Sequence, residues 1–175
     1  NFLNDADEYV VTEAARGIND DLSIPDAIPA LGNLLNTTSF KSEALIRRAI
    51  NANVRMGTEA SIQNLVNYAS NKSHPAALIA EAVAAVSNWA RPSVLDRVDG
   101  RFRGAFKRDS MLVKNKAGDA ILSLLNSNEA AVRLSAVKAV NKLHLEKGAD
   151  KLLAILKTDK SANVKVEKEI NVIVD

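Results

Sequence analysis

The chain has 175 residues and is 47% hydrophobic, which suits a single domain with one buried core. Its 23 Lys and Arg residues against 21 Asp and Glu residues give a net charge of +2, which excludes wholesale electrostatic binding to nucleic acid or membrane. The lack of cysteine excludes disulfides, thiolate nucleophiles and cysteine-ligated zinc. No apolar run reaches the roughly 18 residues of a membrane span, so we expect a soluble chain.

Apolar residues recur at the spacing i, i+3, i+4 in most segments, which is typical of amphipathic helices. In chain order, the predicted helices are residues 8–20, 26–36, 42–57, 58–70, 75–90, 117–127, 129–143, 148–158 and 161–174. Short turn-rich links join them, and such links predict antiparallel pairs of neighbouring helices.

Every second helix repeats one pattern. The first apolar anchors are Val11, Leu45, Leu78, Val132 and Val164, so the successive steps are 34, 33, 54 and 32 residues. Four residues after the first four anchors stand Ala15, Ala49, Ala82 and Ala136, which we expect to be buried at equivalent positions. The long step is one repeat plus about 21 residues, which predicts an insertion at about 90–110 between the two helices of a pair.

The period near 33 residues, with the sequence VRLSA at 132–136, resembles HEAT and HEAT-like repeats over nearly the whole chain. The resemblance implies an all-α fold, an α-solenoid of antiparallel helix pairs of the HEAT/armadillo-like type. We therefore expect residues 1–175 to form a single HEAT-like repeat domain. The chain begins almost directly at a second helix and ends without a polar cap, which favours a fragment of a longer chain.

The predicted insertion differs from its surroundings, because residues 91–108 carry six Lys or Arg residues against two Asp residues. Arginine suits bidentate recognition of carboxylate or phosphate, and aromatic rings could stack on a ligand. The candidate interaction residues are Trp89, Arg91, Arg97, Arg101, Arg103 and Arg108.

A structural role for the same stretch is the main alternative, and the two roles can coexist. The residues that would shape the insertion are Pro92, Asp96, Asp99 and Gly100. Irregular backbone commonly needs such side-chain partners. We expect the stretch to fold back as an ordered loop, with Trp89 at least partly buried and Asp96 or Asp99 paired to Arg97, Arg101 or Arg103.

A second resemblance rests on a motif inside the insertion, formed by Trp89, Pro92, Ser93, Asp96, Arg97, Val98, Gly100 and Arg103. It is similar to a motif in the HEAT-like region of large multidomain planctomycete, verrucomicrobial and Bacteroidetes proteins, where the helices lie between a sorbosone-dehydrogenase-like propeller and a c-type cytochrome domain. The resemblance implies a periplasmic or exported protein. This chain reads Phe102-Arg103-Gly104 where that family tends to read Trp-Arg-Pro, and it contains neither a propeller nor a haem motif.

Catalytic and metal-binding signals are weak. His74 and His144 are far apart, and each adjoins a predicted turn, which favours capping or surface roles over a zinc site. Asp96 and Asp99 are the one carboxylate pair in an irregular segment, but the surrounding arginines would suppress the proton-donating form. We therefore expect a chain that is not an enzyme and that needs no metal or cofactor.

These observations favour a non-catalytic scaffold that binds neighbouring domains of the same polypeptide or another protein. The alternative is a nucleic-acid-binding solenoid that uses the basic insertion, because the architecture also resembles helical-repeat DNA glycosylases. The near-neutral charge and the two Asp residues count against nucleic acid. The Ala-rich segment 76–86 lacks the Lys and Arg of a membrane-surface helix, and no small-molecule substrate is evident.

Overall fold

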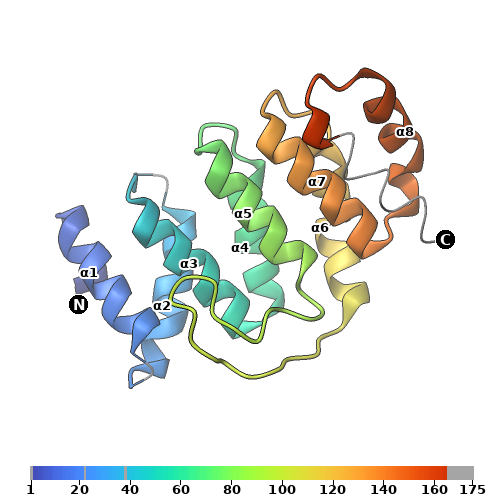
Figure 1. Cartoon of the computed structure of the whole chain (residues 1–175). Helices are drawn as coiled ribbons and strands as arrows, with labels where there is room; N and C mark the ends of the chain where they lie inside the picture. Colours follow the sequence, from blue (N-terminus) through green and yellow to red (C-terminus); the bar gives the residue numbers. More distant parts are fainter. Residues whose placement is uncertain (1, 22, 38, 165–175) are drawn as a thin grey trace.

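Figure 1 shows the computed structural model, which describes residues 2–21, 23–37 and 39–164. Within these ranges the chain forms α-helices and short 3-10 turns with no β-strand. The prediction of an all-α chain is confirmed.

The α-helices are α1 (Glu8–Asp20), α2 (Ile28–Asn33), α3 (Glu43–Met56), α4 (Glu59–Ser70), α5 (Ala76–Ser87), α6 (Ser110–Leu124), α7 (Ala130–Leu143) and α8 (Ala149–Thr158). Most agree with the predicted segments to within three residues at each end. The main differences are α2, which is flanked by 3-10 turns at Pro25–Ala27 and Leu34–Asn36, and α6, which begins seven residues before the predicted start. Of the helix predicted at 161–174, residues 162–164 are helical and 165–174 lie outside the described residues.

Side-chain caps explain where several helices begin. The side chains of Asp7, Ser42, Thr58 and Asp109 accept hydrogen bonds from backbone N–H groups in the first turns of α1, α3, α4 and α6. Such caps satisfy donors that have no partner within the helix. The Asp109 cap adds two turns to α6, and Val113 in these turns is fully buried.

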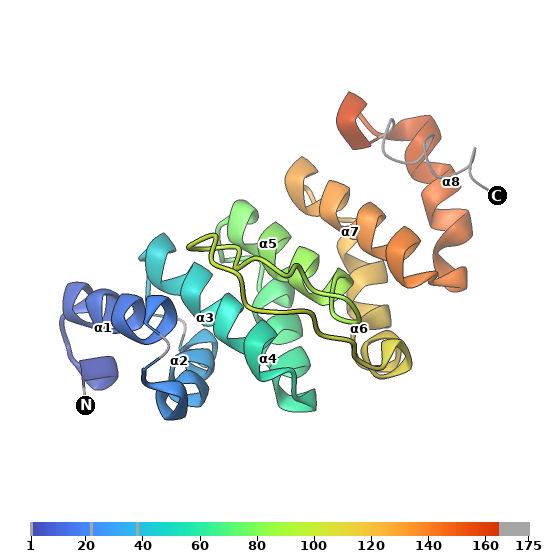
Figure 2. The same ribbon diagram turned by 60° about the horizontal axis from the view of Figure 1, so that its bottom comes forward.

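The helices lie in two layers. In Figure 1, α1, α3, α5 and α7 stand side by side, with α2, α4 and α6 behind them, and the turned view of Figure 2 separates the two rows. Each predicted pair is in contact: α2 with α3, α4 with α5, and α6 with α7. The four repeat alanines Ala15, Ala49, Ala82 and Ala136 are fully buried, as the repeat alignment predicted. Their small side chains let neighbouring helices approach closely.

The insertion occupies residues 88–109. It leaves the end of α5, runs back across α3 toward α1, and returns to the start of α6 (Figures 1 and 2). The prediction that it lies between the two helices of a pair is wrong. It joins α5, the second helix of its pair, to α6, the first helix of the next, so both pairs keep short internal links.

Candidate functional site

The middle of the insertion is a tight reversal of the chain. Leu95 and Phe102 form an antiparallel bridge. The backbone N–H of Arg103 donates to the carbonyl oxygen of Val94 at 2.8 Å, and that of Asp96 to the carbonyl oxygen of Arg101 at 2.8 Å. Gly100 adopts a φ of 74°, a left-handed conformation that glycine accepts without strain, which explains a glycine at this turn.

Asp96 is the centre of the reversal, and its side chain is fully buried. Its Oδ1 accepts hydrogen bonds from the backbone N–H groups of Val98 at 2.8 Å and Asp99 at 3.3 Å. Its Oδ2 accepts from Asn51 Nδ2 at 2.8 Å and from Arg103 Nε at 3.0 Å. The predicted pairing of an insertion carboxylate with an insertion arginine is confirmed, and four donors offset the cost of burying the charge.

Arg103 links the reversal to α1. Its side chain is only 7% exposed, and Nη2 donates to Asp99 Oδ2 at 2.7 Å and to the carbonyl oxygen of Asn19 at 2.9 Å. Asn51 of α3 also donates to Asn19 Oδ1 at 2.8 Å. The insertion, α1 and α3 therefore share one buried polar network.

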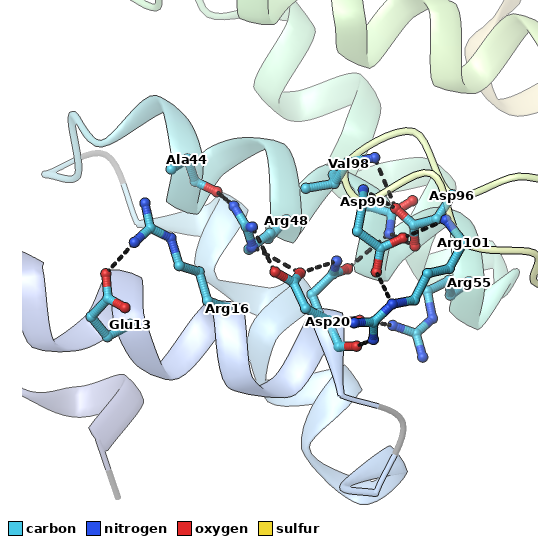
Figure 3. A network of polar contacts seen from close by, with 12 residues as sticks. Glu13, Arg16, Asp20, Ala44, Arg48, Arg55, Asp96, Val98, Asp99 and Arg101 are labelled. Carbon is cyan, nitrogen blue, oxygen red and sulfur yellow. Dashed lines mark hydrogen bonds and ion pairs between the residues drawn. The ribbon is translucent and has the colours of Figure 1, made fainter.

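Further arginines surround this network, as Figure 3 shows. Arg101 donates to the carbonyl oxygen of Asp20, and Arg48 forms an ion pair with the Asp20 carboxylate at 2.8 Å. Arg55 Nη1 donates to the carbonyl oxygen of Asn19 at 3.1 Å. Burial, and next the nearby charge of Arg103, lower the pKa of Arg55, although the Asp96 and Asp99 carboxylates act in the opposite direction.

A second anchor holds the two ends of the insertion together. Trp89 is 1% exposed, and the Arg108 guanidinium lies 4.8 Å from the centre of its ring. Arg108 Nη2 donates to the carbonyl oxygen of Val54 at 2.6 Å. The guanidinium passes over Gly57, where a Cβ atom would lie 2.6 Å from Arg108 Nε. Gly57 is the residue that caps the C-terminus of α3, and because it has no side chain it leaves room for the arginine.

The structure divides the predicted interaction residues into two groups. Trp89 is buried in the core, as predicted, so it is not available to a partner. The assignment of Arg103 and Arg108 to an exposed surface is wrong, because both arginines are committed to contacts with the helices. Arg91, Arg97 and Arg101 are exposed. The predicted structural residues Asp96, Asp99 and Gly100 belong to the reversal, and Pro92 is half-buried beside it.

The helix residues of the polar network were not predicted. Asn19 and Asn51 are buried and lie inside predicted helices. An asparagine on an apolar helix face needs a hydrogen-bond partner, so its presence there was a usable signal. That signal indicates a buried polar contact but does not identify the partner.

The pKa of Asp96 predicts an acid dependence of stability. Burial alone would raise this pKa, but hydrogen bonds from Val98, Asn51, Asp99 and Arg103 outweigh burial and lower it below the ordinary value of 3.8. A lowered pKa in the folded state gives stability that is present above the unfolded pKa and lost as the pH falls through the folded one.

We therefore expect the wild type to be more stable than Asp96→Asn at neutral pH, and the difference to shrink as the pH falls below about 4. Urea denaturation of both proteins at a series of pH values measures this difference. Because the two proteins carry the same carboxylates at every other position, the difference between their free energies of unfolding reports the titration of Asp96. A difference that stays constant down to the lowest pH would contradict the assignment.

The two histidines lie outside the insertion. The His74 ring stacks on Tyr68 with centroids 4.0 Å apart, and His144 ends α7 in a left-handed conformation. In the described part of the chain, no three His, Asp or Glu side chains come close enough together to hold a metal ion. The expectations of no metal, no cofactor and no enzymatic activity stay predictions.

Among the helices that the structure describes, none combines the length and the apolar character needed to cross a membrane.

Comparison with known protein families, with curated proteins and with solved structures found no match to this chain.

Proposed function

We propose that the chain is an α-solenoid of HEAT-like helix pairs and serves as a non-catalytic scaffold for protein or interdomain contacts. The repeat period, the contacts within each predicted pair and the equivalent burial of the four repeat alanines support this architecture. The partner is a neighbouring domain of a longer polypeptide or another protein, in both cases with an acidic and partly apolar surface.

The exposed side of the insertion carries the proposal. We call it the outer face and define it by Val94, Leu95, Arg97, Arg101 and Phe102. Phe102 is 72% exposed and Leu95 50% exposed, although the backbone between them is fixed by the buried network around Asp96. Exposed apolar groups rimmed by charge are typical of protein-binding surfaces, and arginine and aromatic residues are enriched there.

A fixed loop is well suited to binding. Ordering a mobile loop on association costs free energy for each immobilised side chain. Here the hydrogen bonds to Asn19 and Asn51 have already ordered the backbone before a partner arrives. The outer face therefore presents its apolar and basic groups in one geometry.

A periplasmic or exported location is part of the proposal and rests on the resemblance of the insertion motif to the multidomain bacterial family. In that setting the helices would connect a propeller to a cytochrome domain.

Nucleic-acid binding is the less favoured function. A phosphate-binding groove needs unpaired cations on several repeats. Three of the helix arginines instead pair with carboxylates: Arg47 with Glu43 and Glu81, Arg48 with Asp20, and Arg133 with Asp159.

Photocrosslinking in the natural host tests the proposed contact. A photoreactive benzoylphenylalanine replaces Phe102 in the full polypeptide, and the same group at Leu153, which is exposed on α8, serves as the control. We expect crosslinks from position 102 to concentrate on one acidic segment. Combining Arg97→Glu with Arg101→Glu should reduce them about tenfold or more, because like charges would then face each other.

Crosslinks from position 153 should not respond to these charge reversals. Equal crosslinking from the two positions, or crosslinks from position 102 that survive both charge reversals, would overturn the proposal. Crosslinks to nucleic acid instead of protein would favour the alternative.

A further inference from the structure

A cavity of about 210 Å³ lies between the insertion and helices α3 and α5. Its apolar wall consists of Val54 from α3, Ala85 from α5, and Pro92, Leu95 and Phe106 from the insertion. This volume is below the usual range of sites for drug-sized molecules, so it suits a small organic molecule or the end of a chain.

The polar wall of the cavity has an excess of positive charge. Arg55, Arg91, Arg97 and Arg103 line it, against the single carboxylate of Asp96. Asp96 and Asp99 both pair with Arg103. In the part of the chain that the structure describes, the other three arginines have no ion-pair partner among the carboxylates.

One of these guanidinium groups is incompletely hydrogen-bonded. Arg103 Nη1 is buried and has no hydrogen-bond partner among the described residues. Because only 7% of the Arg103 side chain is exposed, bulk solvent does not reach this atom. A buried donor without an acceptor is costly and rare in folded proteins. An anionic oxygen in the cavity that Arg103 lines would supply the missing acceptor.

We infer that this cavity binds the carboxylate of a small organic acid that carries an apolar body. The carboxylate matches the planar guanidinium groups of Arg55 and Arg103, and the apolar body matches the wall formed by Val54, Leu95 and Phe106. A doubly charged phosphate fits less well, because the Asp96 carboxylate lines the same space and would repel it.

This site does not depend on the proposed function. Its principal cation, Arg55, is on α3 behind the insertion. Leu95 and Arg97 belong to both the outer face and the cavity lining, whereas Arg101 and Phe102 belong to the outer face alone. A ligand in the cavity would contact three elements at once, namely α3, α5 and the insertion.

Titration with benzoate tests the inference, with benzamide as the uncharged analogue of the same shape. We expect benzoate to bind saturably with one molecule per chain, and benzamide to bind about tenfold more weakly or worse. Arg55→Gln should weaken benzoate binding by a similar factor. Arg101→Gln removes a guanidinium from the insertion outside the cavity and should leave the affinity within about twofold of the wild type.

A tripeptide that ends in phenylalanine, with either a free carboxylate or an amidated end, identifies the source of the carboxylate. Binding of the free-acid peptide would indicate a polypeptide terminus as the natural ligand. Binding of benzoate without the peptide would indicate a free organic acid.

Lack of saturable binding by both acids would overturn the inference, as would equal binding of benzoate and benzamide. An unchanged benzoate affinity in a folded Arg55→Gln protein would also overturn it. If circular dichroism shows that Arg55→Gln is unfolded, Arg97→Gln replaces it with the same expected result, because Arg97 is exposed at the rim of the cavity. Loss of benzoate binding with intact crosslinking from position 102 would reject the cavity site alone.

Discussion

Replacing Asp96 with alanine is expected to lower the free energy of unfolding by about 3–5 kcal/mol. The Asp96 side chain is fully buried and accepts four hydrogen bonds, one of them from the 7% exposed Arg103. Removing the carboxylate leaves the Arg103 charge buried with Asp99 as its remaining partner and removes one of the two acceptors of Asn51. Both losses destabilise the same network.

Urea denaturation followed by the fluorescence of Trp89, the single tryptophan, measures this effect. The matched control is Arg97→Ala, one residue along the chain, which is exposed and should change stability by less than about 0.5 kcal/mol. If Asp96→Ala changed stability as little as the control does, the network would not be what fixes the insertion.

Replacing Trp89 with alanine is the other substitution with a large expected effect, also about 3–5 kcal/mol. The side chain is 1% exposed, and its removal leaves a large void where the insertion leaves α5. The same change removes the ring that lies under the Arg108 guanidinium. Because the variant has no tryptophan, thermal unfolding followed by circular dichroism is the suitable measurement.

Phe102→Ala provides the contrast for Trp89→Ala. Both changes remove a large aromatic side chain from the insertion, but Phe102 is 72% exposed, so its loss should change stability by less than about 0.5 kcal/mol. Equal destabilisation by the two substitutions would show that the aromatic residues of the insertion do not divide into an inner and an outer group.

Helix positions were largely predictable because the repeat supplies several aligned copies of one pattern. Ala15, Ala49, Ala82 and Ala136 were identified by their shared register, and all four are fully buried. The start of α6 was missed because the repeat pattern has no counterpart for residues 110–116. The local signal was Asp109, whose side chain caps the helix.

The internal chemistry of the insertion was predictable for a different reason. Asp96, Asp99 and Arg103 are close in sequence, and clustered opposite charges in irregular backbone are expected to pair. Their partners Asn19 and Asn51 are far away in the chain, and no local pattern predicts such contacts. The inward direction of Arg108 depends on the carbonyl of Val54 and the open space above Gly57, which only the folded chain brings together.

The reach of the insertion also bears on how the chain unfolds. Where each helix touches only its neighbours, stability approximates a sum of nearest-neighbour terms and the ends can open independently. The insertion departs from this scheme, because Arg103 binds the carbonyl of Asn19, 84 residues earlier in the chain. The Asp96 network couples α1 and α3 to the loop that follows α5, so we expect these three helices to open together as one cooperative unit.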